Sequence, residues 1–430
     1  MPRPAGSAQG TGVLTEKFSL LAERPRLRFA VFETNLNRAN TIGFLLLFLA
    51  LIICYRVWLW RLERLYECTA RQVLVRANAA GKLQSAVVAR RSVRLLSYNV
   101  FVRPPGVSAR GNDFKDERLG RLLAYMVLSD LDVVALQELF RFGSPRQQAF
   151  CRVARRLGGY RYSAALPYPP RGRSSPPRVL DGGVTILSRF PIERVAISTY
   201  RCAHWHFIDC IVAKGVLCAH IRIPLGNRES GAGGTTTLAV FATHAQAGNV
   251  LYPGIRGVRR KQVQQLRAFV QQEAGRRAMP VVVCGDLNVN GMHVEGDDRD
   301  SPEYVDMLNI LNGDASTAPA LSRSFQFRDL LKEAYHGRHP ATVDAVTAAG
   351  TPREPLLSPV NSHKQPKRLD YVLCDAGPGM ECTLKQAKVE PFFLEPWDPA
   401  PFRQLSDHDA VLVEMEFVAS SGDREHANGP

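Results

Sequence analysis

Four apolar runs of this chain end next to carboxylate, amide or imidazole side chains, and this pattern constrains the fold more than any other feature. The runs span residues 93–97, 133–136, 238–242 and 281–284. They are short and mostly rich in valine, leucine and alanine, so they predict buried strands. Strands buried on both faces belong to sheets that are covered by other layers. The sequence therefore predicts an α/β protein with polar groups at the edge of a sheet.

Six polar segments contribute these groups, and most of them follow a predicted strand. They are Leu96–Asn99, Leu136–Glu138, Thr243–Ala247, Gly285–Asn288, Leu369–Tyr371 and Ser406–His408. One such strand ending is common and means little. Six in one chain have the composition of a metal-dependent site that cleaves phosphate esters.

The chain divides by composition into a membrane-proximal part and one large domain. We expect a flexible basic arm over residues 1–40, a connector with an amphipathic helix over 61–92, a catalytic domain over 93–418 and a disordered tail over 419–430. Helical patterns at residues 117–129, 146–157 and 259–276 alternate with the predicted strands. The apolar content of 45% is sufficient for a large core.

Residues 41–60 predict a single transmembrane helix. About 20 residues are needed to cross the hydrocarbon layer, and this run suffices if Arg56 extends toward the head groups. Tyr55, Trp58 and Trp60 are of the aromatic types that lie at membrane interfaces. The alternative, a buried core helix, fits poorly because the run is apolar on all sides.

Several weaker features bear on location and partners. Arginines flank the apolar run on both sides, so the positive-inside rule does not decide its orientation. The chain has no Asn-x-Ser/Thr site, and its nine cysteines lack paired spacing. Both features favour a cytosolic catalytic domain.

The net charge of +15 suits nucleic acid or an anionic membrane surface. No basic stripe interleaved with aromatic residues occurs, so we expect lipid and no nucleic acid.

Glu138 and Asn99 are the candidate metal ligands. A carboxylate near an amide oxygen suits a hard cation such as Mg²⁺, for which Mn²⁺ can substitute. The alternative for Glu138 is an ordinary surface acid at a strand end.

His408 is the candidate general base. It lies just before a predicted final strand, and Asp370 can orient its ring while Asp407 supports it. Asp286 and Asn288 follow a strand with spacing that directs both to one side, where they can hold a water and a phosphoryl oxygen. The alternative for this pair is a turn with capping side chains.

His244 supplies a second imidazole, suited to donating a hydrogen bond to developing phosphate charge. Four aromatic residues, Phe392, Phe393, Trp397 and Phe402, lie between Asp370 and His408 in sequence. They pack in the core or form a rim that enters the bilayer.

The order of these segments resembles the endonuclease/exonuclease/phosphatase superfamily, and within it the neutral, Mg²⁺-dependent sphingomyelinases. The segments that carry the narrower likeness are Gly182–Ile192, Asp209 with Ala213–Leu217, Thr243–Ala247, Gly285–Val289 and Tyr304–Leu308. The likeness covers about residues 94–416. It implies a DNase I-like fold, a four-layer sandwich of two mixed β-sheets flanked by helices, here preceded by one N-terminal transmembrane helix.

The resemblance also implies an activity. It predicts a phospholipase C-type hydrolase that cleaves sphingomyelin, or a related phosphosphingolipid, to ceramide and a phosphorylated head group. In that family the counterparts of Asp209 and Lys214 are linked to switching between inactive and active arrangements, and we expect anionic phospholipids to favour the active one. The alternatives are a nuclease or phosphatase of the same superfamily and a non-enzymatic membrane adaptor.

Two departures from the family pattern stand out. Ala245 occupies a position where leucine is usual, and the loop Pro167–Arg178 is long and basic. The apolar run also precedes the domain, whereas some family members carry C-terminal spans or none.

Overall fold

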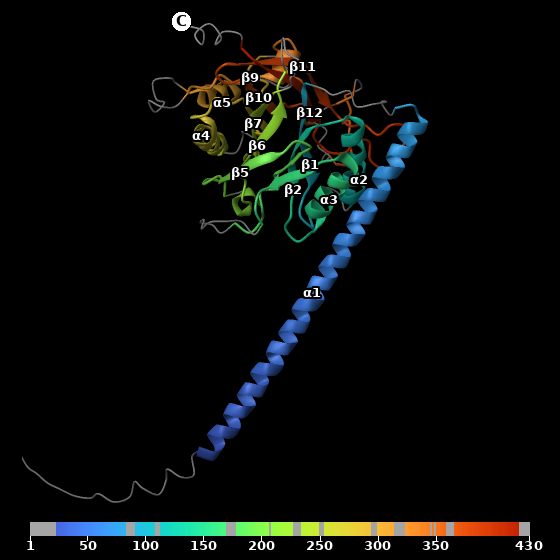
Figure 1. Ribbon diagram of the computed structural model, residues 1–430, viewed down its shortest axis with the longest axis vertical. Coiled ribbons are helices and arrows are strands. Elements are labelled where there is room, and N and C mark those ends of the chain that lie inside the picture. The colour runs from blue at the N-terminus through green and yellow to red at the C-terminus, as the bar shows by residue number, and fades with distance from the viewer. Residues whose placement is uncertain are drawn as a thin grey trace, which may run out of the picture. The chain divides into compact units, whose positions relative to one another are not determined.

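The computed structural model describes residues 23–82, 91–107, 112–168, 178–205, 208–226, 234–248, 253–293, 299–313, 323–344, 346–347, 350–357 and 365–420 (Figure 1). The chain separates into two units, Met1–Trp58 and Leu59–Pro430. Most of the expected N-terminal arm's first half, the tip of the basic loop at 169–177 and the tail at 421–430 lie outside the described residues.

The first helix, α1, runs from Glu23 to Ala79 and so begins inside the segment expected to be an irregular arm. Its stretch Asn40–Ala79 holds the one window, among the described residues, that is long and apolar enough to cross a membrane. Apolar side chains here are exposed, with Phe44 at 76%. An exposed, uniformly apolar helix is the pattern of a membrane span and differs from that of a core helix.

The last part of α1 belongs to the second unit and has a different character. Leu59, Leu62, Tyr66, Ala70 and Val73 are buried at intervals of three or four residues, which is the spacing of one helix face. This face packs in the same core as α2 (Lys115–Leu128) and α3 (Arg146–Gly158). The expected amphipathic connector is thus a continuation of the long helix.

Two six-stranded mixed sheets form the centre of the second unit. The first has the order β11-β12-β1-β2-β4-β3, and the second has the order β5-β6-β7-β8-β10-β9. The strands of the first sheet are β1 (Val93–Val102), β2 (Val133–Leu139), β3 (Tyr162–Ala165), β4 (Thr185–Ser188), β11 (Met380–Glu390) and β12 (Ala410–Ala419). Those of the second are β5 (Ile192–Thr199), β6 (Gly215–Pro224), β7 (Thr235–His244), β8 (Val281–Asp286), β9 (Arg328–Asp329) and β10 (Asp370–Asp375).

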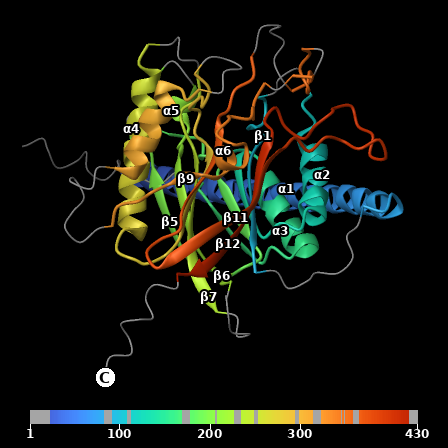
Figure 2. The same cartoon turned by 90° about the horizontal axis from the view of Figure 1, so that it is seen from above.

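Helices cover the outer faces of both sheets (Figure 2). Helices α2, α3 and the end of α1 pack on the first sheet, and α4 (Ile255–Ala274) and α5 (Pro302–Asn312) pack on the second. A third apolar core fills the space between the sheets. The short helices η1 (Ile208–Ile211) and α6 (Leu330–Ala334) complete the unit. This is the expected four-layer sandwich, so the fold prediction is confirmed.

Helix α5 and the aromatic segment at residues 392–402 are two places where the structure adds to the sequence-based prediction. Helix α5 was not expected from apolar periodicity, yet Ser301 caps it by accepting a hydrogen bond from the Tyr304 backbone N–H at 3.0 Å, and Pro302 starts it. In the aromatic segment, Phe392 and Phe402 are buried in the core of the first sheet, whereas Phe393 is 45% exposed. Trp397 is half-buried and packs against the same core. The core alternative therefore holds for Phe392 and Phe402 and in part for Trp397.

We predict that Phe241→Ala lowers the free energy of unfolding by about 3–5 kcal/mol. The ring of Phe241 on β7 is fully buried and meets that of Phe269 on α4 edge-on, with centroids 5.7 Å apart. Urea unfolding of the detergent-solubilised chain measures the loss. Val195→Ala on β5, where the side chain is 45% exposed, serves as control and should cost under about 0.5 kcal/mol. A loss no larger for Phe241→Ala would contradict this packing.

Candidate active site

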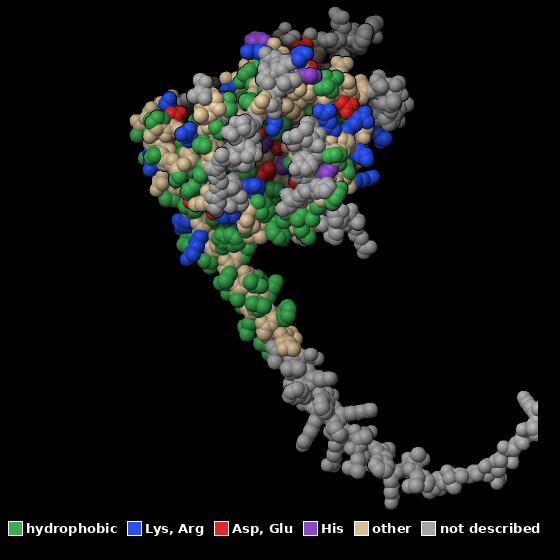
Figure 3. Space-filling view, turned by 180° about the vertical axis from the view of Figure 1, so that it is seen from behind, with side chains coloured by type: hydrophobic (Ala, Val, Ile, Leu, Met, Phe, Trp, Pro, Cys, Tyr) green, Lys and Arg blue, Asp and Glu red, His purple; other side chains and the backbone are tan. Residues whose placement is uncertain are grey.

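The ends of five strands bring the predicted site residues together. Strands β1 and β2 are parallel, as are β7 and β8, so the carboxyl ends within each pair lie at the same edge. Strand β10 runs antiparallel to β8 and begins where β8 ends, which places Asp370 directly opposite Asp286. Figure 3 shows acidic and histidine side chains inside a hollow on one face.

His408 and Asp370 form the pair expected of an oriented general base. The Nδ1 atom of His408 lies 2.9 Å from Oδ2 of Asp370, and Nε2 lies 3.8 Å from Oδ2 of Asp286. Burial opposes charge on His408, but the carboxylates of Asp370, Asp286 and Asp407 outweigh it and hold its pKa well above the usual value. The imidazole therefore has a high proton affinity.

The pKa of Asp286 is also raised, which for a carboxyl group favours the neutral form. Burial raises its pKa to about 7, against the charge of His408, which favours the carboxylate. Its Oδ1 accepts a hydrogen bond from the Asn288 backbone N–H at 2.9 Å, and its Oδ2 accepts one from Nδ2 of Asn99 at 3.1 Å. Asp286 and His408 thus lie within one buried, electrostatically coupled group.

Glu138 and Asn99 lie beside this group. Nδ2 of Asn99 donates to Oε1 of Glu138 at 3.2 Å, and it lies 3.5 Å from Nε2 of His408. The second oxygen of Glu138, Oε2, is buried and has no hydrogen-bond partner among the residues that the structure describes. Glu138 also has a left-handed backbone with φ of 57°, a strained conformation for a side chain of this kind. A buried carboxylate oxygen without a partner fits a hard divalent cation.

A second set of ligand atoms lies close by. Carboxylate oxygens of Asp286 and Asp370 and a ring nitrogen of His408 lie within 4.8 Å of one another and can also hold a metal ion. The His408–Asp370 hydrogen bond already engages one atom of each, whereas Oε2 of Glu138 is open. Glu138 and the group of Asp286, Asp370 and His408 are therefore two places in this site that could hold a metal ion.

His244, at the end of β7, connects this group to Lys214. Its Nε2 lies 3.4 Å from Oδ2 of Asp286 and 3.1 Å from Nζ of Lys214. Burial, then the charges of Lys214 and His408, lower the pKa of His244 well below its usual value. A neutral His244 ring is thus available as a hydrogen-bonding group.

Lys214 contacts Asp209 and His244 at the same time. Its ammonium lies 2.8 Å from Oδ2 of Asp209 and donates to the Ala245 carbonyl at 2.8 Å. Both side chains are buried. The pair is therefore an internal ion pair at the edge of the site, and a plain surface salt bridge is excluded.

Two other predicted residues occupy the periphery of the site. Asn288 has a left-handed backbone with φ of 53°, and its Nδ2 donates to the Ala245 carbonyl at 3.2 Å. Asp407 lies 3.3 Å from the hydroxyl of Ser406, and burial raises its pKa to about 6. All ten predicted residues belong to one region, and Asp407 is the member whose described hydrogen bond is to a residue outside the ten, Ser406.

Arg118 is a buried residue that sequence reasoning missed. Its guanidinium donates to the carbonyls of Val100, Phe101 and Leu405 at 2.7, 2.8 and 2.6 Å. It therefore joins the end of β1, which carries Asn99, to the segment that carries His408. An arginine within the apolar stripe of a predicted helix was the available signal.

Gln246 is a second buried residue whose contacts the sequence did not predict. Its Nε2 donates to Oδ2 of Asp209 at 3.0 Å, and its Oε1 accepts from the His204 backbone N–H at 2.8 Å. Gln262 on α4 in turn accepts from the Gln246 backbone N–H at 2.8 Å. These contacts fix Asp209 in place opposite Lys214.

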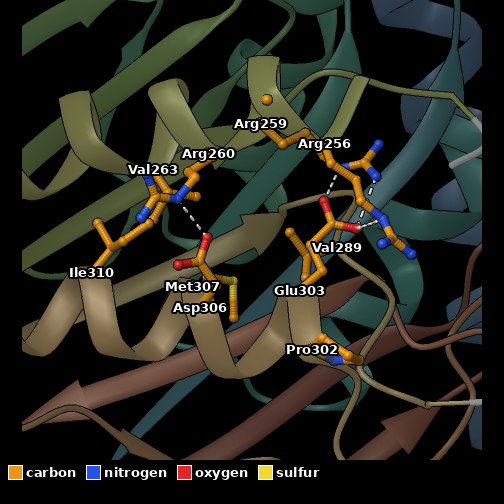
Figure 4. Close-up of a pocket in the computed structure, with 11 residues that line it drawn as sticks. Arg256, Arg259, Arg260, Val263, Val289, Pro302, Glu303, Asp306, Met307 and Ile310 are labelled. Carbon is orange, nitrogen blue, oxygen red and sulfur yellow. Dashed lines mark hydrogen bonds and ion pairs between the residues drawn. The ribbon is translucent and has the colours of Figure 1, made fainter. Parts of the chain in front are cut away.

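A separate cavity of about 200 Å³ lies between α4 and α5 (Figure 4). Its charged groups are paired within the protein. Arg259 binds Glu303 at 2.6 Å and Arg260 binds Asp306 at 2.9 Å. None of the predicted catalytic residues lines this cavity, so it is distinct from the candidate active site.

Curated relatives of this chain carry sphingomyelinase names, as the resemblance predicts. A sphingomyelinase of Dictyostelium discoideum is 26% identical over 465 residues, which span 76% of this chain and 99% of that protein. Sphingomyelinase C of Leptospira interrogans is 26% identical over 251 residues, which span 54% of this chain and 39% of that protein.

Solved structures share the fold. Beta toxin from Staphylococcus aureus has a TM-score of 0.51 at 20% identity, with 75% of this chain and 99% of the toxin covered. A variant of that toxin solved with bound magnesium ions has a TM-score of 0.52 at 19% identity, with the same coverage. At such identity these matches show the fold alone.

The family model described as the endonuclease/exonuclease/phosphatase family matches residues 96–408, which include nearly the whole sandwich and every predicted site residue. The chain belongs to the endonuclease/exonuclease/phosphatase family.

Proposed function

We propose that this enzyme is a membrane-anchored, Mg²⁺-dependent phosphodiesterase that cleaves sphingomyelin, or a related phosphosphingolipid, to ceramide and a phosphorylated head group. One observation carries the reaction class. A histidine paired with a buried carboxylate, His408 with Asp370, lies beside a carboxylate oxygen of Glu138 that has no partner. The sphingomyelinase names of the relatives support the substrate class.

The metal would be held mainly by Glu138, with Asn99 nearby. Bound there, Mg²⁺ would polarise the phosphoryl oxygens and stabilise the additional negative charge of the transition state. Mn²⁺ is the expected substitute because it also accepts oxygen ligands. A beta-toxin variant of the same fold was solved with magnesium ions, which supports this choice of cation.

The protein's own groups would manage the proton and the phosphate. His408, oriented by Asp370, takes a proton from a water that Asp286 and Asn288 position, and Asp407 stabilises the resulting imidazolium. As the water oxygen bonds to phosphorus, the bond between phosphorus and the ceramide oxygen breaks, and the ceramide oxygen takes a proton from a water molecule. His244 donates a hydrogen bond to the phosphoryl oxygens, and its position next to Lys214 strengthens that interaction.

Lys214 and Asp209 would set the state of this site. Their buried pair holds the ammonium against His244, so separating it would change the charge next to the phosphate. We infer that anionic phospholipids favour the arrangement in which Lys214 serves the active site. The apolar stretch of α1 supports membrane attachment, and we place the catalytic unit in the cytosol.

The deciding assay is hydrolysis of defined lipids by the detergent-solubilised chain. We expect release of a phosphorylated head group from vesicles of sphingomyelin or another phosphosphingolipid, increased by anionic phospholipid. Lys214→Ala should remove the increase. Lysophospholipids, DNA and a soluble phosphomonoester complete the panel. Cleavage of DNA or of the monoester alone would replace the proposal by a nuclease or a phosphatase.

We predict that Glu138→Gln weakens Mg²⁺ binding by at least about 10- to 100-fold. The change removes the negative charge of the carboxylate and leaves an amide of nearly equal size. Oε2 of this carboxylate is buried and has no partner among the described residues. Calorimetric titration with Mg²⁺ measures the affinity without relying on turnover. Glu193→Gln, at an acid outside the site that pairs with Arg222 on β6, should leave the affinity unchanged. Full hydrolysis in excess chelator would exclude a metal requirement.

We predict that Asp407→Asn moves the acidic limb of the pH–rate profile to lower pH by about 1 unit. Hydrolysis requires neutral His408, so the rate rises as pH passes its pKa. The Asp407 carboxylate is one of the charges that raise this pKa, and its loss must lower it. Asp306→Asn on α5, whose partner is Arg260, is the control and should leave the profile in place. A limb that moves to higher pH would contradict the assignment of His408 as base.

A further inference from the structure

Arg103 is half-buried and, unlike the fully buried arginines of the second unit, has no described acceptor for its guanidinium. Two of its guanidinium nitrogens, Nε and Nη2, are buried without a hydrogen-bond partner among the described residues. Among the described residues, Arg118 binds three carbonyls, Arg259 binds Glu303 and Arg368 binds Asp329. Burying such donors without an acceptor is costly, and charged donors raise the cost. An unpaired buried guanidinium is therefore expected where a ligand supplies the acceptor.

The two free nitrogens form one recognisable edge of the group. The Nε and Nη2 hydrogens of arginine point the same way in a fixed fork, which matches two oxygens of a phosphate or a carboxylate. Both atoms are free on Arg103. The open feature is thus a bidentate oxyanion site.

The guanidinium is held in place by its surroundings. It lies over the ring of Phe101, 4.1 Å from the ring centroid. Phe101 has a left-handed backbone with φ of 51°, and its backbone N–H donates to Oδ1 of Asn99 at 3.1 Å. Nζ of Lys115 donates to the Val107 carbonyl at 2.5 Å and fastens the turn that follows Arg103.

These contacts place Arg103 next to the catalytic groups. Arg103 directly follows β1, the strand whose Asn99 contacts Glu138 and Asp286. Its charge also acts on Asp407. Burial raises the pKa of Asp407, and the charge of Arg103 is among those that oppose the rise. The free edge is therefore at the same end of the sheet as the metal ligands and the base.

We propose that the Nε–Nη2 edge of Arg103 binds two phosphoryl oxygens of the substrate or of the released phosphomonoester. This inference deepens the proposed function and rests on it for the identity of the lipid. The site holds the acidic residues Glu138, Asp286, Asp370 and Asp407 close together, and an anionic phosphate entering it needs positive charge beyond that of the metal. Lys214 is engaged by Asp209, whereas Arg103 is free.

Equilibrium binding of inorganic phosphate and of phosphocholine tests the inference without turnover. Calorimetry on the detergent-solubilised, Mg²⁺-supplied full chain compares wild type with Arg103→Gln, Arg103→Lys and the control Arg141→Gln. Arg141 lies three residues after Glu138 with an exposed side chain, so its loss removes an equal charge near the site. We expect Arg103→Gln to weaken binding of both anions about 10- to 100-fold, Arg103→Lys to recover part of it and Arg141→Gln to leave it unchanged.

Hydrolysis of sphingomyelin vesicles then distinguishes the two sources of phosphate. If Arg103→Gln raises KM, the Nε–Nη2 edge binds the lipid phosphodiester. If Arg103→Gln weakens product inhibition and leaves KM unchanged, the edge binds the released monoester. Equal anion affinity in wild type and Arg103→Gln, no measurable affinity in wild type, or an equal loss in Arg141→Gln overturns the inference while the proposed function stands. Anion binding that depends on Arg103 in a chain that does not hydrolyse sphingolipid keeps the inference and removes the proposed function. Unchanged thermal unfolding of Arg103→Lys guards against a folding defect.

Discussion

The buried contact between His408 and Asp370 is the interaction on which the rest of the site depends. Two carboxylates, Asp370 and Asp286, face one imidazole and all three side chains are buried, and such a group is stable only if its charges are matched. Against the effect of burial, the carboxylates of Asp370, Asp286 and Asp407 hold the pKa of the imidazole well above its usual value. Burial raises the pKa of Asp286 to about 7, against the opposing charge of His408. The surplus of negative charge makes the site receptive to a cation, and Oε2 of Glu138 has no hydrogen-bond partner among the described residues.

The scaffold keeps this charged group together with buried cations that bind the backbone. Arg118 joins the carbonyls of Val100 and Phe101 to that of Leu405, so the strand end with Asn99 and the segment with His408 move as one body. On the other sheet, Lys214 binds the Ala245 carbonyl together with Asp209. Each cation satisfies several acceptors at once, which offsets the cost of burying it.

The sequence predicted the sandwich and the composition of the site, because strand ends with polar residues leave a clear local pattern. Residues such as Asn99, Glu138 and Asp286 come together as expected, since parallel pairing brings their strand ends to one edge. Helix α5 and the helical start at Glu23 escaped prediction, as capping by Ser301 and polar helical stretches carry little periodicity. Arg118 and Gln246 escaped because their roles lie in contacts with distant backbone groups, which no local pattern encodes.

The contacts of Lys214 are another feature that depends on the folded chain and not on a local pattern. The sequence shows Asp209 five residues before Lys214 but does not show which groups the ammonium contacts. In the folded chain, η1 and β7 bring Asp209 and His244 to opposite sides of one ammonium, so it serves both. Gln246 and the Ala247 backbone N–H bind the same oxygen of Asp209. Asp209 therefore retains two donors if Lys214 leaves, which lowers the cost of separating the pair and makes Lys214 the partner that can move.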